Sequence, residues 1–157
     1  MDESPLGCLL IARQGPEDRD DLTQDHLLEL AELARSCGFV VHAQRSLKRS
    51  QIASKTFYGS GQLEALAEEA VRQGLRHLIC DDELTGSQVN AIEKLTGLIC
   101  LDRTGLILSI FEQRAQTREA KAQVELARFE YELPRLKGAW THLERQVGGV
   151  GVRGGAG

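Results

Sequence analysis

Short apolar runs alternate with amphipathic segments over the first hundred residues of the chain. The runs have the length of β-strands and cover residues 6–12, 39–43, 75–80 and 98–101. Between them, apolar residues recur at helical spacing, and each helical segment is followed by a glycine suited to the end of a helix: residues 20–37, 62–73 and 87–96, followed by Gly38, Gly74 and Gly97. Because the runs are apolar throughout, both faces of their sheet are expected to be covered. The pattern predicts an α/β fold with a four-stranded parallel sheet and flanking helices.

A longer helical segment follows the fourth apolar run. Residues 102–133 contain no proline, and their only glycine, Gly105, lies near the start. These properties predict one uninterrupted helix of about seven or eight turns. After Pro134, residues 136–146 keep a helical pattern, and a glycine-rich tract then fills residues 148–157.

Side chains of this predicted long helix sort into an apolar strip and a basic arc at about 100° per residue. The strip consists of Ile107, Phe111, Ala115, Ala122, Leu126, Phe129 and Leu133. The arc consists of Arg114, Arg118, Lys121, Arg128 and Arg135. An apolar strip between opposite charges is typical of an antiparallel helical hairpin, so we expect an element after residue 157, or another chain, to cover it. The arc has two open interpretations: a surface for a polyanion, or a solvated face paired with nearby glutamates.

The distribution of charge divides the chain. The 157 residues are 41% hydrophobic and carry a net charge of −4, but residues 1–102 have a balance of −7 and residues 103–157 a balance of +3. We therefore predict an α/β subdomain over residues 1–102 and a long helical subdomain over residues 103–157 that ends in a glycine-rich tip. No membrane-spanning run and no leader segment is recognised, so a cytoplasmic location is expected.

Residues 45–61 form a basic segment without acidic residues just before a predicted helix. Its candidate phosphate-binding residues are Lys55, Gly59, Ser60 and Gly61, because a glycine turn at a helix N-terminus presents free N–H groups. A purely structural turn is the other interpretation, since Gly-x-Gly alone lacks the third glycine of the dinucleotide-binding pattern.

Carboxylates end the third and fourth apolar runs. The sequence Asp81-Asp82-Glu83 and the later Asp102 stand where parallel sheets bind ligands, so a Mg²⁺ site is one interpretation. Capping of the following helix, aided by Thr85, is the favoured one. No catalytic or metal-ligating residue is assigned, because the histidines and the four cysteines are scattered. The phosphate-binding sequence G-x-x-x-x-G-K-[ST] does not occur in the 157 residues.

Seven short stretches carry a recognisable family pattern. They read DDELT at residues 81–85, DRTGLIL at 102–108, QRAQTRE at 113–119, QVELA at 123–127, LPRL at 133–136, THLERQ at 141–146 and GGVGVRG at 148–154. Together they resemble the HflX family of ribosome-associated GTPases over essentially the whole chain. The chain departs from that family where residues 59–62 lack lysines and where residues 155–157 follow the last stretch.

The resemblance implies an N-terminal α/β subdomain, a helical hairpin and then a GTPase domain that would lie beyond this chain and would use GTP and Mg²⁺. It implies that the glycine-rich tract is the tip of the hairpin and approaches RNA of the large ribosomal subunit near the peptidyl-transferase centre. It also implies that the whole protein helps to split ribosomes under stress. No cofactor is expected to bind in these 157 residues.

We therefore expect the N-terminal, ribosome- and RNA-binding region of an HflX-type GTPase. The residues expected to contact phosphate lie on the basic arc or in the tip: Arg114, Arg118, Lys121, Arg128, Arg135, Arg145, Gly148, Gly149, Gly151, Arg153 and Gly154. Two alternatives stay open. One is a nucleotide- or small-ligand-binding α/β domain with weak ATPase activity that uses residues 55–61 and the acidic cluster at residues 81–83. The other is a protein-interaction module that uses the apolar strip.

Overall fold

Four strands and five helices build residues 6–148, the part of the chain that the computed structural model describes; side chains are described to residue 135. In chain order the elements are β1 (Gly7–Gln14), α1 (Asp20–Ser36), β2 (Val40–Lys48), α2 (Ser60–Gln73), β3 (His77–Cys80), α3 (Gly86–Thr96), β4 (Ile99–Asp102), α4 (Arg103–Arg114) and α5 (Arg118–Gly148). The strands pair in parallel in the order β2-β1-β3-β4. The predicted fold class is confirmed.

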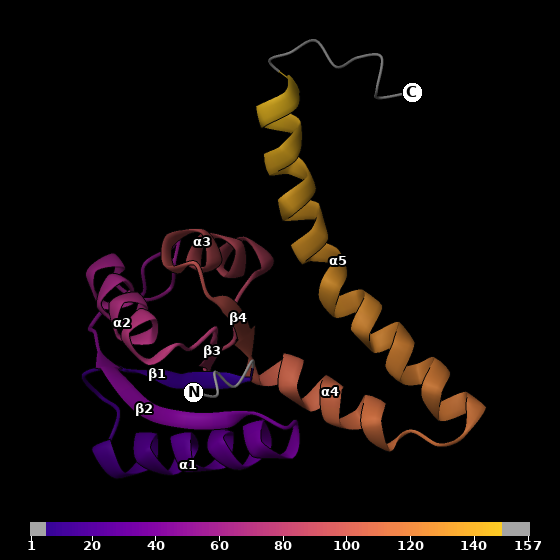
Figure 1. Ribbon diagram of the computed structural model, residues 1–157, viewed down its shortest axis with the longest axis horizontal. Helices are drawn as coiled ribbons and strands as arrows, with labels where there is room; N and C mark the ends of the chain where they lie inside the picture. Colours follow the sequence, from indigo (N-terminus) through magenta and orange to yellow (C-terminus); the bar gives the residue numbers. More distant parts are fainter. Residues whose placement is uncertain (1–5, 149–157) are drawn as a thin grey trace.

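Two apolar cores cover the two faces of the sheet. In β1, Leu9 and Ile11 pack with residues of α2 and α3, whereas Cys8 and Leu10 pack with residues of α1. This alternation follows from the two-residue period of a strand, and it explains why a strand covered on both faces reads as a continuous apolar run. Leu106 of α4 lies in the same core as α1, so α1 and α4 share one face of the sheet (Figure 1).

Glycines end the first three helices, as the sequence predicts. Gly38, Gly74 and Gly97 have φ values of +91°, +68° and +75°, in the left-handed region that side chains disfavour. The strand predicted at residues 39–43 is longer than expected, because β2 continues to Lys48. It lies at an edge of the sheet, so about half of its surface is open and polar residues are tolerated there.

The prediction of one uninterrupted helix over residues 102–133 is wrong. The chain leaves the helical conformation at Ala115, where ψ is 122°, and a new helix begins at Arg118. The hydroxyl of Thr117 accepts a hydrogen bond from the Ala120 N–H at 3.0 Å, so Thr117 caps α5. α5 then continues through Pro134 to Gly148. Figure 1 shows α4 leading away from the sheet and α5 folding back past β4 and α3.

Among the residues whose side chains are described, α5 contributes none to either core. Its large apolar side chains are mostly exposed: Leu126 is 59%, Phe129 61% and Leu133 49% accessible. Within residues 6–148, no helix combines the length and apolar character needed to cross a membrane.

Candidate functional site

Three exposed cations surround the turn between α4 and α5. Arg114 ends α4, while Arg118 and Lys121 lie in the first turn of α5. Their side chains make no hydrogen bond or ion pair with any residue that the structure describes. We call these three residues the basic turn. Long, unpaired cations on an exposed turn are free to contact phosphate groups.

The two other described members of the predicted basic arc are paired within the fold. Arg128 donates to Glu112 Oε2 at 2.6 Å and to Glu132 Oε1 at 3.2 Å. Arg135 donates to Asp102 Oδ2 at 3.2 Å, and its guanidinium lies 3.7 Å from the centre of the Tyr131 ring. A phosphate bound by either arginine would have to compete with these partners, so the structure divides the arc into free and engaged cations.

The remaining predicted contacts fall at the end of the chain. Gly148 is the last residue of α5, and the side chain of Arg145 lies outside the description. Gly149, Gly151, Arg153 and Gly154 also lie outside the described residues.

The predicted phosphate turn forms the start of α2. Gly59 is the N-cap, and its N–H donates to Gln62 Oε1 at 3.1 Å. Ser60 and Gly61 are exposed in the first helical turn, and Lys55 is exposed in the loop before it. The side chain of Gln62 thus already accepts the N–H of the N-cap, and phosphate binding by the exposed first turn stays a prediction.

Sequence reasoning missed Arg49, which lies against this turn. A Cβ atom on Gly59 would stand 2.5 Å from Arg49 Nη1, so any side chain at this position would displace the guanidinium. The Nε atom of Arg49 is buried without a hydrogen-bond partner among the described residues. Its membership of the basic segment was the available signal, but no local pattern could place its guanidinium beside Gly59.

A polar pocket of about 580 Å³ lies beside Arg49 at the ends of β1 and β2. Its lining consists of Gln14, Gly15, Pro16, Asp18, Asp20, Lys48, Arg49 and Ser50. Two cations therefore face two carboxylates. None of the four predicted phosphate-binding residues lines this pocket.

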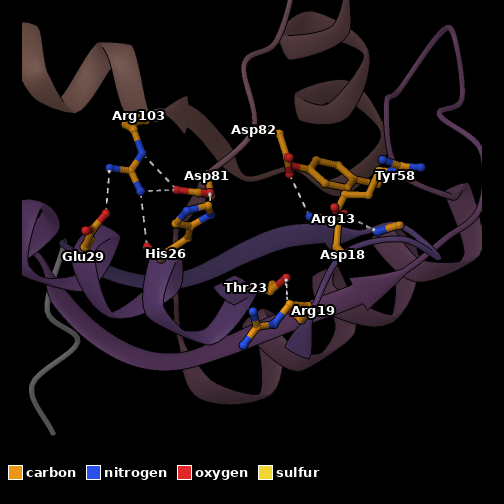
Figure 2. A network of polar contacts seen from close by, with 11 residues as sticks. Arg13, Asp18, Arg19, Thr23, His26, Glu29, Tyr58, Asp81, Asp82 and Arg103 are labelled. Carbon is orange, nitrogen blue, oxygen red and sulfur yellow. Dashed lines mark hydrogen bonds and ion pairs between the residues drawn. The ribbon is translucent and has the colours of Figure 1, made fainter. Parts of the chain in front are cut away.

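Ion pairs fill the carboxyl end of β3 (Figure 2). Arg103 binds Asp81 through two of its nitrogen atoms, one of them at 2.9 Å, and also lies 3.8 Å from Glu29. His26 Nδ1 stands 3.9 Å from Asp81 Oδ2. The Arg103 guanidinium therefore already neutralises Asp81, which disfavours binding of a further cation there.

Asp82 joins three segments beside this cluster. Its Oδ2 atom accepts hydrogen bonds from the Arg13 N–H and from the Tyr58 hydroxyl, both at 2.8 Å. Burial raises the pKa of the Asp82 carboxyl, and burial followed by the nearby acidic groups raises the pKa of Tyr58. These contacts, visible in Figure 2, hold the loop before α2 against β1 and β3.

Helix capping, the interpretation that the sequence favours, is confirmed only in part. Thr85 Oγ1 accepts from the Gln88 N–H at 3.1 Å and caps α3. Asp81 and Asp82 do not cap that helix, because their oxygens serve Arg103, Arg13 and Tyr58 instead.

Comparisons with known proteins agree with this architecture. Residues 24–112 match the family described as GTP-binding GTPase N-terminal, and residues 114–157 match the GTP-binding GTPase middle region. GTPase HflX of Flavobacterium psychrophilum is 45% identical over 135 residues, which are 86% of this chain and 33% of that protein. GTPase HflX of Magnetococcus marinus is 41% identical over 155 residues, 99% of this chain and 36% of that protein. The chain thus spans about a third of the length of the curated relatives it matches.

Solved structures share the fold. A crystal structure of a GTP-binding protein from Sulfolobus solfataricus in complex with GDP has a TM-score of 0.64 and 23% identity, over 86% of this chain and 39% of that one. A variant of the protein SsGBP has a TM-score of 0.67 and 25% identity, over 85% of this chain and 41% of that one. The parallel sheet, the two helices after it and the matches along nearly the whole sequence lead to one conclusion: the chain belongs to the HflX family of GTPases and corresponds to its N-terminal and middle regions.

Proposed function

We propose that these 157 residues form the ribosome-binding part of an HflX-type GTPase, which contacts RNA of the large subunit and helps to split ribosomes. The observation that carries the proposal is the basic turn. Arg114, Arg118 and Lys121 are exposed and unpaired within the described structure, at the end of α4 farthest from the sheet. Residues 1–102 carry a charge balance of −7 and residues 103–157 a balance of +3, so attraction to a polyanion is expected from the latter.

GTP hydrolysis is proposed for a domain outside these residues. The printed sequence holds no G-x-x-x-x-G-K-[ST], whose backbone N–H groups and lysine cradle the phosphates in P-loop proteins. GTP and Mg²⁺ would bind in that domain, and the part described here would contribute contact with the ribosome.

The test is binding of the chain to purified large ribosomal subunits over a series of salt concentrations. Changing Arg114, Arg118 and Lys121 together to Gln should weaken binding and reduce the slope of log K against log salt by about two units, since each lost phosphate contact removes about 0.7–0.9. The matched control replaces three exposed cations of α2, α3 and the loop after α2 by Gln, namely Arg72, Arg76 and Lys94. Equal effects of the two triple variants, or binding independent of salt, would contradict the proposal.

A second candidate is a ligand site at the pocket beside Arg49. The unpartnered Nε atom of Arg49 and the neighbouring Lys48 favour an anionic group such as a nucleotide phosphate. Calorimetry with ATP and GTP, with and without Mg²⁺, tests this function, and Arg49→Gln should remove the heat. If no nucleotide gives heat, this candidate is rejected, while the ribosome-binding test is unaffected because Arg49 lies outside the basic turn.

A further inference from the structure

Within residues 118–135, the part of α5 with described side chains, the seat of this helix on the sheet body (residues 7–114) is polar. We call α5 the arm. The side chains that α5 directs toward the body at this seat come from little more than one turn, namely Tyr131 and Arg135. The Tyr131 hydroxyl donates a hydrogen bond to Asp102 Oδ1, and Arg135 donates one to Asp102 Oδ2 at 3.2 Å. Asp102 itself is only 1% exposed at the end of β4. A single buried carboxylate is therefore the centre of the contact between the arm and the body.

The same carboxylate is also held from the body side. The Gly105 N–H donates to Asp102 Oδ1 at 3.1 Å, and the Leu84 N–H donates to Oδ2 at 3.4 Å. Removal of α5 would leave these two backbone donors in place and would open the other lone pairs to water. The body can thus stabilise the ionised carboxylate whether or not the arm is seated.

Two glycines make the close approach of α5 possible. A Cβ atom on Gly86 would stand 2.9 Å from the Arg135 Cα and N atoms and from the Pro134 carbonyl oxygen. A Cβ atom on Gly105 would stand 2.9 Å from the Tyr131 hydroxyl. Asn90 of α3 adds a hydrogen bond to the Arg135 carbonyl at 3.3 Å. We call Asp102, Tyr131, Arg135 and these two glycines the Asp102 joint.

Little apolar burial supports the joint. No described side chain of α5 enters either core, and Leu126, Phe129 and Leu133 are exposed. Arg128 also links α5 to α4. It donates to the Ser109 hydroxyl at 3.2 Å and pairs with Glu112, which is 59% exposed, where ion pairs contribute little. Within residues 118–135, polar contacts rather than burial in the two apolar cores therefore seat α5 on the body.

We infer that α5 is a detachable lever: the Asp102 joint holds it in one orientation, and loss of the joint's polar contacts releases the helix from α3 and α4 while the sheet body keeps its fold. The device is a two-position element, because the close packing over Gly86 is either made or lost. The inference does not depend on what the basic turn binds.

The experiment is NMR on the ¹⁵N-labelled 157-residue chain, with residual dipolar couplings and amide exchange. In the wild type, the amides of residues 7–114 and of residues 118–135 should fit one alignment tensor. In the double variant Tyr131→Phe, Arg135→Gln, the couplings of α5 should fall to less than about half while those of the sheet stay unchanged. Exchange protection of the Gly105 amide should persist in this variant, because its N–H still donates to Asp102 Oδ1 within the body.

Three further variants keep the test decisive. Gly86→Ala should release α5 by steric conflict alone, whereas Gly61→Ala, where a Cβ meets nothing within 4 Å, should leave the couplings unchanged. Arg128→Gln should also leave them unchanged, since it removes only the surface link. One unaltered tensor in both joint variants would overturn the inference. Loss of the sheet's spectrum in those variants would overturn it as well, because the arm would then be an integral part of the fold.

Discussion

The sheet body, residues 7–114, and the arm, α5, differ in what holds each in place. The body buries Leu9, Leu10 and Ile79 completely and is covered by apolar helix faces on both sides. The arm exposes Leu126, Phe129 and Leu133, and within residues 118–135 it meets the body through hydrogen bonds to Asp102. Apolar burial is non-directional and is summed over many residues, whereas a polar joint depends on a few atoms in fixed geometry. Fold and orientation are therefore controlled by different parts of this sequence.

The largest expected contrast comes from matched truncations in the two regions. Leu9→Ala removes a fully buried side chain of β1 and should lower the free energy of unfolding by about 2–5 kcal/mol. Leu126→Ala truncates a side chain of α5 that is 59% exposed. It should change the free energy of unfolding by less than about 0.5 kcal/mol. Urea unfolding followed by circular dichroism measures both. Similar losses would mean that α5 is part of the core.

Asp102→Asn tests the point at which the two regions meet. The substitution keeps the size of the side chain but removes the charge that Tyr131 and Arg135 recognise, and should cost about 1–3 kcal/mol. Asp21→Asn is the control, because Asp21 forms an exposed ion pair with Arg19 and should change stability by less than about 1 kcal/mol. If the control costs as much in the same urea titration, burial of the Asp102 contacts has no special effect.

The pH dependence of stability tests the burial of one residue of the body, His77. Burial, followed by the nearby Arg76 charge, lowers the pKa of His77 from its ordinary value of 6.5, and its Nδ1 atom is buried without a partner in the described structure. Below pH 6.5 the unfolded chain binds a proton that the folded chain does not, so stability falls as the pH drops through that value toward the lowered pKa.

His77→Gln should therefore flatten the dependence of the unfolding free energy on pH between 6.5 and the lowered folded pKa. His42→Gln, at an exposed position of β2, is the control. Urea titrations at several pH values measure the slope. An unchanged slope in His77→Gln, or an equal change in the control, would show that burial of His77 carries no proton linkage.

The smallest effect is expected at the surface link between α4 and α5. Arg128→Gln breaks the ion pairs with Glu112 and Glu132 and should cost about 0.2–1 kcal/mol at low salt. The difference from the wild type should shrink at about 1 M salt, because exposed pairs are screened. A loss that persists at high salt would indicate that this link, and not only the Asp102 joint, seats the arm.

The elements of the body were predictable because their causes are local. Continuous apolar runs marked the four strands, and Gly38, Gly74 and Gly97 marked helix ends that need a positive φ. The extra length of β2 was missed because an edge strand carries polar residues such as Arg45 and Lys48, which look like a loop. The candidate phosphate residues were found at the start of α2, but the neighbouring Arg49 was not, because its contact with Gly59 is made across the fold.

The break between α4 and α5 had a local signal in the sequence, but a weak one. No proline or glycine marks it, since residues 115–117 read Ala-Gln-Thr, and helical periodicity continues across it. The capping residue Thr117, followed by Glu119 in the first turn, was the local signal that a second helix begins. The chain reverses direction within residues 115–117. A hydrophobic pattern judged over several helical turns does not detect so short a break.

The sequence by itself determined the class of fold, the family and the separation of an acidic body from a basic arm, because burial pattern, turn chemistry and charge are properties of neighbouring residues. Only the tertiary structure decided which cations are free. Arg135 looks like Arg118 on a helical projection, yet it pairs with Asp102, 33 residues earlier in the chain. That pairing exists because the chain turns back at residues 115–117 and two glycines let α5 approach the end of β4. Long-range contacts of this kind have no local pattern, and they set where the arm points.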